Sequence, residues 1–398
     1  YVRDPLELAA GPLVLTPHEF YLITLLDGNR SLRDIKLEFA RKFGGVLLPD
    51  EQLQEIINAL DAGHYLDTEG FREHFRRIQE EFRQAPVRVA WHARQAYPDD
   101  PEQLRQLLDG FYEHPRGAGK PFSASEGTAS PFALPDNRRL TGILAPHIDL
   151  RVGGPCYTHA YRYLIENSDA DLYIILGVAH YGGEGFFITT TKDFETPLGT
   201  VPTDREFVQR WMENAGEDLT REEWAHRIEH SIEFQLPFLQ HGLGRPFSIV
   251  PVLCGHLEPP LSETGELSPD PRIAGLIESL GTTIAQTHRR VAFILSVDLA
   301  HMGPKFGDPR PITPEDQERI READQIMFDV VSRLEREAFA GLMRYDLLPR
   351  RVDACAAVYT FLSLMPEGEG RLVAYDQNFQ EDTGSLVSYG SMIFVSPK

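Results

Sequence analysis

The stretch "VAFILSVDLAHMG", residues 291–303, ends an apolar run with polar residues that can carry out chemistry. Its opening "VAFIL" has the composition of a fully buried strand, and Asp298 and His301 follow where such a strand would leave the core. In open α/β sheets, ligands bind at this edge, beyond the carboxyl ends of the strands. The position of the two residues therefore favours a chemical role over a packing role.

Similar apolar runs recur from Leu140 onward, separated by helical stretches. They read "LTGILAP", "DLYIILGVA", "FSIVPVL" and, late in the chain, "RLVAYDQ" and "VSYGSMIFV". Strands that alternate with helices are typical of an α/β domain with a mostly parallel central sheet. We expect such a domain over residues 86–398, with a Gly-, Ser- and Pro-rich linker or surface loop at residues 116–136.

Residues 1–85 predict a separate small domain. Three stretches have apolar residues at helical spacing and each closes on a glycine: "TPHEFYLITLLDG", "SLRDIKLEFARKFG" and "PDEQLQEIINALDAG". Thr16, which precedes Pro17, and Ser31 are the expected N-caps of the first two helices. The following "HYLDTEG" predicts a short strand and turn. Three helices and a small hairpin indicate a winged-helix-like α+β domain.

The charge of the chain argues against several partners. A net charge of −21 repels phosphate backbones and anionic lipids, so we expect neither nucleic acid nor a membrane as the main partner. Residues 1–85 contain 10 Lys and Arg against 15 Asp and Glu, a net charge of −5, which disfavours DNA binding by this domain. A peptide or protein fits better, and a packing or dimerisation appendage without a ligand is the alternative.

The remaining composition is that of an ordinary globular protein. The chain has 398 residues, 42% of them hydrophobic, which is enough for two packed cores. Its three cysteines are too few and too scattered for a disulfide framework. It contains neither a recognisable signal peptide nor an apolar run of about 20 residues. We therefore expect a cytoplasmic protein.

Polar side chains follow four of the predicted strands. They are His147 after "ILAP", His180 after "IILGVA", Cys254 after "IVPVL", and Asp298 with His301 after "FILSV". A single histidine at a strand end is usually structural, but several at one edge indicate a metal or acid–base centre. Neutral imidazole and carboxylate bind iron, copper or zinc, and two His with one carboxylate leave coordination positions open. The cluster predicts a catalytic metal site.

The segment "RIEHSIEFQLPFLQ" reads as a helix with Glu229, His230 and Glu233 near its start. In one interpretation the two glutamates are an ordinary acid pair on the solvated first turn. In the other, His230 enters the pocket as an acid–base group and one of the glutamates orients its ring. Periodicity alone does not choose between them.

Five motifs stand in the order and approximate spacing of the Memo family: "LAPH", "ILGVAH", "EHSIEFQLPF", "VPVLCG" and "SVDLAHMG". The chain resembles this family over about residues 87–398. The resemblance implies a fold similar to LigB-type extradiol dioxygenases, with a non-haem metal pocket. It also implies association with an AMMECR-type protein and a radical-SAM protein, with this chain as protein B of the AmmeMemoRadiSam system. The order of elements in residues 1–85 resembles the PqqD-like domains that hold peptides for radical-SAM enzymes.

The resemblance also implies metal ligands. His147 and His180 match the two histidine positions of the family. The third family ligand is a cysteine in a "CG" motif, but "RRVDACAAVYTFL" places Asp353 at that point and Cys355 two residues later. A carboxylate there favours Fe(II), whereas a thiolate favours copper. The other residues that would complete the pocket are His230, Asp298 and His301.

These implications predict a metal-dependent redox enzyme that activates oxygen. His147, His180 and Asp353 would hold iron, while His230 and His301 would move protons and Asp298 would orient one of those rings. Two alternatives stay open. One is a non-catalytic accessory or peptide-binding protein with a vestigial metal pocket, and the other is metal-assisted hydrolysis with zinc.

Overall fold

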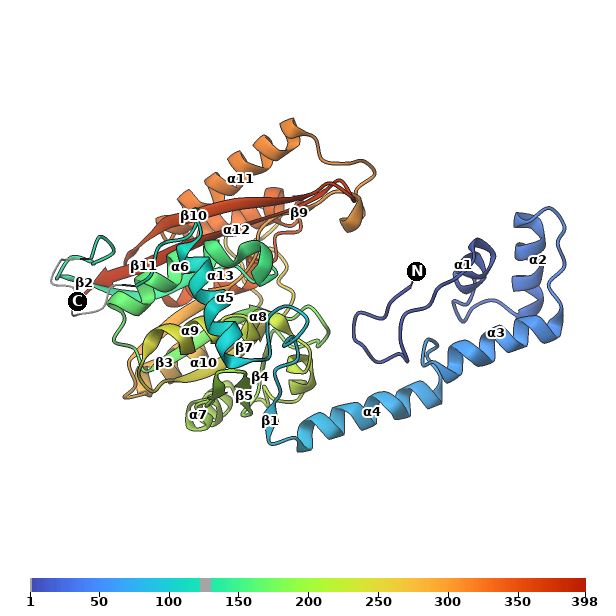
Figure 1. Ribbon diagram of the computed structural model, residues 1–398, viewed down its shortest axis with the longest axis horizontal. Helices are drawn as coiled ribbons and strands as arrows, with labels where there is room; N and C mark the ends of the chain where they lie inside the picture. The colour runs from blue at the N-terminus through green and yellow to red at the C-terminus, as the bar shows by residue number, and fades with distance from the viewer. Residues whose placement is uncertain (1, 122–129) are drawn as a thin grey trace. The chain divides into compact units, whose positions relative to one another are not determined.

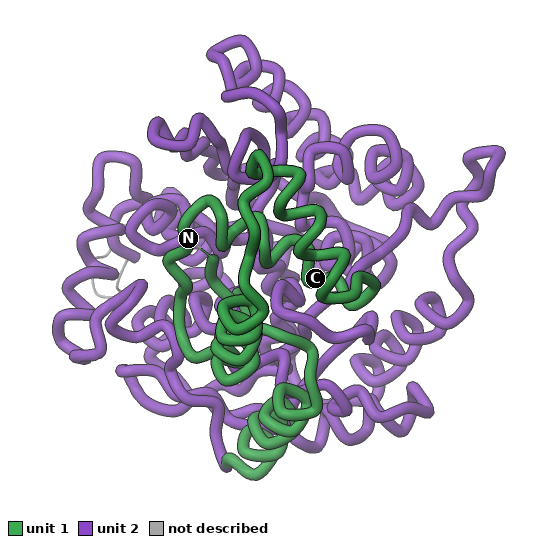
Figure 2. Tube along the Cα trace, turned by 90° about the vertical axis from the view of Figure 1, so that its right-hand side faces the viewer, with its two compact units in different colours: residues 1–85 green, residues 86–398 purple. Residues whose placement is uncertain are grey.

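The computed structural model describes residues 2–121 and 130–398. It divides into two compact units, residues 1–85 and residues 86–398 (Figure 2). Residues 122–129 of the predicted loop lie outside the described residues, as does Tyr1. Within the described ranges, no helix is both long and apolar enough to cross a membrane.

Unit 1, residues 1–85, is helical. Its helices are α1 (Pro17–Ile23), α2 (Leu32–Lys42), α3 (Asp50–Ala62) and α4 (Glu69–Gln84). The first two begin as predicted, because Thr16 and Ser31 each form a reciprocal capping box with the acidic residue three positions later. The apolar faces of α1, α2 and α3 and the connections between these helices meet in a small core of Leu22, Leu25, Ile35, Phe39, Leu48 and Leu53.

The predicted hairpin after α3 is wrong. His64 adopts a left-handed φ of 61° and the Tyr65 N–H donates to the Leu60 carbonyl at 2.8 Å, so these residues terminate α3. The Thr68 hydroxyl then accepts from the Phe71 N–H and starts α4. Two helix ends thus account for "HYLDTEG", and within residues 2–85 the only strand-like pairing is a single bridge between Val2 and Leu13. Neither a winged helix nor a PqqD-like domain is supported.

Unit 2, residues 86–398, contains an eight-stranded sheet with the order β10-β11-β2-β8-β3-β7-β4, and β9 pairs with β11. Its strands are β2 (Arg138–Ala145), β3 (Leu172–Val178), β4 (Phe187–Thr189), β7 (Ser248–Cys254), β8 (Val291–Ser296), β9 (His301–Met302), β10 (Glu369–Gln380) and β11 (Ser385–Pro397). The four central strands β2, β8, β3 and β7 are parallel to one another.

The outer strands correct the prediction of a mostly parallel sheet. The strands β10 and β11 form a hairpin, and β11, β9 and β4 all pair antiparallel with their neighbours, so the sheet is mixed. Residues 381–384 close the hairpin, with Gly384 at a φ of 62°. Two apolar runs separated by so short a turn return antiparallel, since a parallel crossover needs a dozen or more residues.

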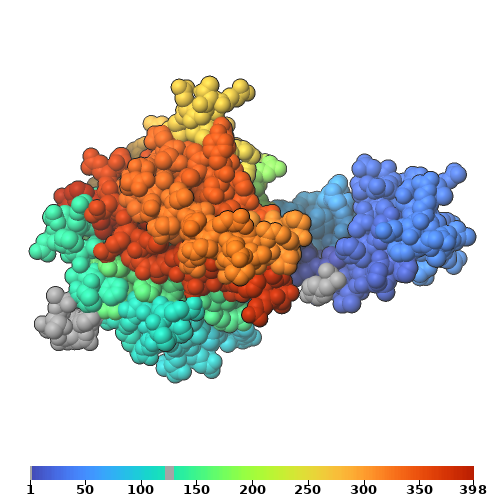
Figure 3. Space-filling model, turned by 90° about the horizontal axis from the view of Figure 1, so that it is seen from above, coloured from blue at the N-terminus to red at the C-terminus, as the bar shows by residue number. Residues whose placement is uncertain are grey.

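Helices cover both faces of this sheet (Figure 1). They are α5 (Pro101–Glu113), α6 (Leu150–Asn167), α7 (Arg205–Ala215), α8 (His230–Glu233), α9 (Leu236–Leu243), α10 (Pro271–Gln286), α11 (Pro314–Ser332), α12 (Arg336–Leu342) and α13 (Cys355–Leu364). Along β3, Tyr173 and Ile175 join the core formed with α5, α6 and α9, while Ile174 and Leu176 join the core formed with α10 to α13. Helix α11 packs on the β10–β11 hairpin, and Figure 3 shows its orange surface beside the red surface of these strands.

A second, three-stranded sheet joins the first residues of unit 2 to residues 193–201. Its strands are β1 (Val87–Arg88), β5 (Asp193–Thr196) and β6 (Gly199–Val201), with β1 parallel to β5. The Arg88 side chain of β1 is completely buried.

Candidate metal centre

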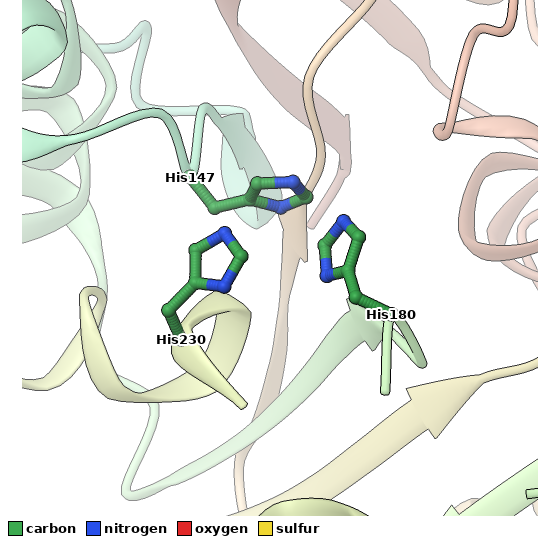
Figure 4. A group of neighbouring side chains, drawn as sticks. All are labelled: His147, His180 and His230. Atoms are coloured by element: carbon green, nitrogen blue, oxygen red, sulfur yellow. The ribbon is translucent and has the colours of Figure 1, made fainter. Parts of the chain in front are cut away.

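The predicted site residues meet at the carboxyl edge of the parallel strands. His147 follows β2, His180 follows β3 and Asp298 follows β8, each two residues beyond the strand end. His230 is the first residue of α8. Figure 4 shows the His147, His180 and His230 rings turned toward one another, and their centroids are 4.8 to 5.1 Å apart.

Two overlapping groups of side chains offer ligand atoms within 4.8 Å of one another. They are His147, His180 and His230, and His147, Asp298 and Asp353. The Oδ2 atom of Asp353 lies 3.0 Å from His147 Nε2 and 3.8 Å from His180 Nε2. The Asp353 carboxylate thus lies near an imidazole nitrogen of both His147 and His180, and two His with one carboxylate are a donor set that suits a metal ion.

The Nδ1 atoms of His147 and His180 both form hydrogen bonds within the protein. His147 Nδ1 lies 2.9 Å from the Ser296 carbonyl oxygen, and His180 Nδ1 lies 3.0 Å from Glu229 Oε1. Both acceptors require a proton on Nδ1, so each neutral ring presents the lone pair of Nε2. Hydrogen bonds of this kind orient the histidine ligands of metal sites.

Glu229 joins β3 to α8. It is the N-cap of α8, where its Oε1 accepts from the Ser231 N–H at 2.9 Å, and its Oε2 accepts from the His180 N–H at 3.0 Å. The same carboxylate lies 3.3 Å from His230 Nδ1. Although burial acts in the opposite direction, the His180 and His230 rings hold the pKa of Glu229 well below its usual range. The interpretation of Glu229 as part of a solvated acid pair is wrong, since the residue is buried.

Glu233 is also buried, but it does not face the His230 ring. Its carboxylate accepts from Arg88 Nη1 and from the Tyr97 hydroxyl. It also accepts from the Trp91 N–H at 3.2 Å and the His92 N–H at 2.9 Å. The structure therefore places Glu229, rather than Glu233, beside the predicted acid–base histidine.

The two aspartates of the site are linked through backbone amides. Asp353 Oδ1 accepts from the Asp298 N–H at 2.9 Å, and Asp298 Oδ1 accepts from the His147 N–H at 3.0 Å. Burial raises the pKa of Asp298, and the negative charge of Asp353 adds to that effect against the pull of His147. Burial acts in the same direction on Asp353, but His147 and His180 hold the pKa of Asp353 well below its usual range.

The charge distribution favours a cation at the point where the histidines meet. Burial lowers the pKa of a histidine, but the Glu229 and Asp353 carboxylates raise the pKa of His180 to about 10. By contrast, burial next to the other rings drives the pKa of His230 well below its usual range. Bound protons or a metal ion can balance the negative charge of the Glu229 and Asp353 carboxylates beside His180.

His301 and Cys355 lie outside both groups of ligand atoms found among the described residues. His301 Nδ1 donates to the carbonyls of Leu299 at 2.9 Å and Arg351 at 3.1 Å, and no hydrogen bond in the described part of the chain joins it to Asp298. The Cys355 thiol donates to the Val352 carbonyl at 3.3 Å, and burial raises its pKa to about 12. A carboxylate, and not this thiol, faces the histidines.

The loop that carries Asp353 is held by a buried ion-pair network. The Arg350 guanidinium donates to Asp324 of α11 and to Asp346, and the Tyr375 hydroxyl donates to Asp324 at 2.9 Å. The Arg350 carbonyl accepts from the His301 N–H at 2.9 Å. One network therefore ties the loops of Asp353 and His301 to a helix.

Two aromatic residues near the site were not predicted from the sequence. The His92 ring lies 5.8 Å from His230, and the Tyr181 ring lies 5.9 Å from His180 and 6.2 Å from His230. The position of Tyr181 directly after His180 was a usable signal. His92 had none, because it lies in an irregular segment far from the other motifs in the sequence.

The sequence matches the family model of Memo-like proteins over residues 88–393. The chain belongs to the Memo-like family. A MEMO1 family protein of Aquifex aeolicus is 31% identical over 396 residues, which cover 99% of this chain and 95% of that relative. One from Methanopyrus kandleri is 30% identical over 310 residues, covering 76% of this Memo-like chain and 96% of the relative. One from Thermus thermophilus is 25% identical over 366 residues, which cover 92% of this chain and 99% of the relative.

Proposed function

We propose that this Memo-like protein is a non-haem metal oxidoreductase in which His147, His180 and Asp353 hold Fe(II). The supporting observation is the approach of two Nε2 atoms to one carboxylate oxygen, at 3.0 and 3.8 Å. Fe(II) bound by two imidazoles and one carboxylate keeps coordination positions open, at which oxygen and a substrate can react. The hydrogen bond of Cys355 to a backbone carbonyl disfavours copper, which prefers sulfur ligands.

The protein sets the ligand geometry through its own hydrogen bonds. The Ser296 carbonyl and the Glu229 carboxylate keep the Nδ1 protons of His147 and His180 in place. Asp298 accepts from the backbone amides of His147 and Ile148, which fixes the turn after β2. These contacts pre-organise the site, so less order has to be created when a cation binds.

His230 and Asp298 are suited to move protons beside the metal. The neutral His230 ring stacks on His180 at 4.8 Å, and Glu229 would stabilise the imidazolium that forms when His230 accepts a proton. Burial raises the pKa of Asp298, so its carboxyl group holds a proton more readily than an exposed aspartate does. His301 donates its Nδ1 proton to backbone carbonyls, which leaves Nε2 as the accepting nitrogen of its neutral ring.

Anaerobic purification, metal analysis and an oxygen-uptake assay test this proposal. We expect stoichiometric iron, together with oxygen uptake that the His147→Ala variant loses. Zinc in place of iron would favour metal-assisted hydrolysis. Stoichiometric metal without oxygen uptake in the presence of reductant and partner proteins would favour the non-catalytic accessory role.

The proposal includes association with an AMMECR-type protein and a radical-SAM protein, on the basis of the family resemblance. Unit 1 is the region proposed to dock a partner or its peptide. Co-purification of tagged full-length protein with each partner, compared with a chain that begins at Pro86, tests this part. Loss of the partner with retention of the metal is the expected result.

A further inference from the structure

Arg88 is completely buried, although a guanidinium group always carries its charge. A buried charge is tolerated only when it is paired and fully hydrogen-bonded. The side chain meets this demand with all three of its nitrogens. Nε donates to the His226 carbonyl at 3.0 Å, Nη2 donates to the Glu229 carbonyl at 2.8 Å, and Nη1 donates to Glu233 and to the Val89 carbonyl.

Three of these acceptors lie on one short segment, residues 226–233. This segment runs from the end of a 3₁₀ turn, Glu223–His226, to the four-residue helix α8. A single helical turn does not hold its geometry alone, because nucleation fixes several residues for one hydrogen bond. The guanidinium spans the segment from its first residue to its last. Between these ends lie Glu229 and His230.

The Glu233 carboxylate, which pairs with Arg88, also contacts a second segment, residues 91–97. Glu233 accepts from the Tyr97 hydroxyl and from the backbone amides of Trp91 and His92. His92 Nε2 then donates to the Ile228 carbonyl at 2.9 Å, beside the His230 ring. Residues 91–97 are thereby fastened to the turn that carries His230.

We propose that the Arg88–Glu233 ion pair is a positioning device for the metal site. It acts through Glu229: by holding the backbone of this residue, it aims the carboxylate that fixes the Nδ1 proton of His180. The inference rests on the proposed metal-binding function. Arg88 touches no proposed metal ligand, so its effect must pass through the Glu229–His230 turn.

Two substitutions at Arg88 separate geometry from charge. Arg88→Met keeps much of the apolar stem and removes the donors. Arg88→Lys keeps the charge but replaces the fork with one nitrogen, which cannot reach three acceptors in fixed directions. We expect both variants to bind Co²⁺, used as the probe, about 10- to 100-fold more weakly than the native protein. We also expect a changed Co²⁺ absorption spectrum.

The apo protein gives a second readout that does not depend on metal. NMR of the histidine rings detects the Nδ1 proton of each ring and its exchange with water. In the native protein the Nδ1 proton of His180, which is hydrogen-bonded to Glu229, should exchange slowly, and Arg88→Met should make it exchange faster. If the native protein binds no Co²⁺, the proposed function fails, but the exchange measurement still decides the positioning role.

A matched control is the Arg162–Glu166 pair within α6, whose side chains are each 6% exposed. Arg162→Met also breaks a buried ion pair, but it should leave the Co²⁺ affinity, the Co²⁺ spectrum and the exchange of the His180 Nδ1 proton unchanged. If Arg88→Met does not fold, Glu233→Gln, which keeps the shape and removes the charge, replaces it with the same measurements. Native-like Co²⁺ affinity and native-like Nδ1 proton exchange in the folded variant, or an equal change in Arg162→Met, would overturn the proposal.

Discussion

The histidine side and the carboxylate side of the candidate centre are held in different ways. His147 and His180 directly follow β2 and β3, which both pair with β8, so the main chain of the sheet sets their spacing. Asp353 lies in a loop between a π-helical turn, Met343–Leu347, and α13. Its neighbour Arg351 has a left-handed φ of 54°, and side-chain ion pairs hold the loop. The histidine positions therefore depend on strand pairing, and the carboxylate position depends on a few charged side chains.

The largest expected effect is on the histidine side. His147→Ala or His180→Ala should abolish stoichiometric metal binding while the fold is kept, because each removes one of only three proposed ligands. Metal content after dialysis and circular dichroism check both statements. His301→Ala is the control, since this ring lies outside the ligand groups of the described residues and should keep the metal. Unchanged metal content in both histidine variants would end the assignment of the site.

On the carboxylate side, we expect Asp353→Ala to lose more metal than Cys355→Ala. The Asp353 oxygen lies 3.0 Å from His147 Nε2, whereas the Cys355 thiol is engaged by the Val352 carbonyl. Parallel titrations of the two variants with Fe²⁺ under anaerobic conditions measure the difference. A greater loss of metal in Cys355→Ala than in Asp353→Ala would assign the third ligand to the Cys355 sulfur.

A further prediction tests the dependence of the carboxylate side on its ion pairs. Arg350→Met leaves the fully buried Asp324 without its cation, which should lower the free energy of unfolding by about 3 to 5 kcal/mol. It should also weaken Fe²⁺ binding, because the same loop presents Asp353. Chemical denaturation and metal titration of one preparation give both numbers. Loss of stability with native metal affinity would show that the loop holds Asp353 without the network.

The same contrast explains how much of the site could be predicted from sequence. Strand-end residues were accessible, because apolar runs such as "VAFIL" mark where a strand leaves the core. The contact between Glu229 and His180 could not be predicted. Periodicity does not show that α8 ends after one turn or that its N-cap, Glu229, lies beside His180. The composition of β10 and β11 does not encode their direction, but the short spacing between them does, because so short a connection only allows an antiparallel return. In unit 1, helix caps and hairpin turns use the same polar and glycine residues, so "HYLDTEG" is compatible with both and the sequence alone does not exclude the wrong one.

The smallest expected effect is a pH dependence of the free energy of unfolding, which arises from His226. His226 is buried, its Nε2 donates to the Ile188 carbonyl at 3.1 Å, and its Nδ1 has no partner among the described residues. Burial lowers the pKa of His226 to about 4, whereas an unfolded histidine has a pKa of about 6.5. The unfolded chain therefore binds the proton first, and the stability from the neutral ring is complete above about pH 6.5 and is lost as the pH falls toward 4.

At pH 5 the protonation of His226 in the unfolded chain lowers the free energy of unfolding by about 2 kcal/mol, because each pKa unit corresponds to about 1.4 kcal/mol. His226→Gln keeps a donor for the Ile188 carbonyl but cannot titrate, so its unfolding free energy should fall less than that of the native protein between pH 7 and pH 5. Urea denaturation of both proteins at the two pH values measures the difference, in which the contributions of all other groups cancel. Equal losses would show that water reaches the ring. A smaller loss in the variant would mean that protonation of His226, whose carbonyl accepts from Arg88, contributes to the destabilisation of the protein by acid.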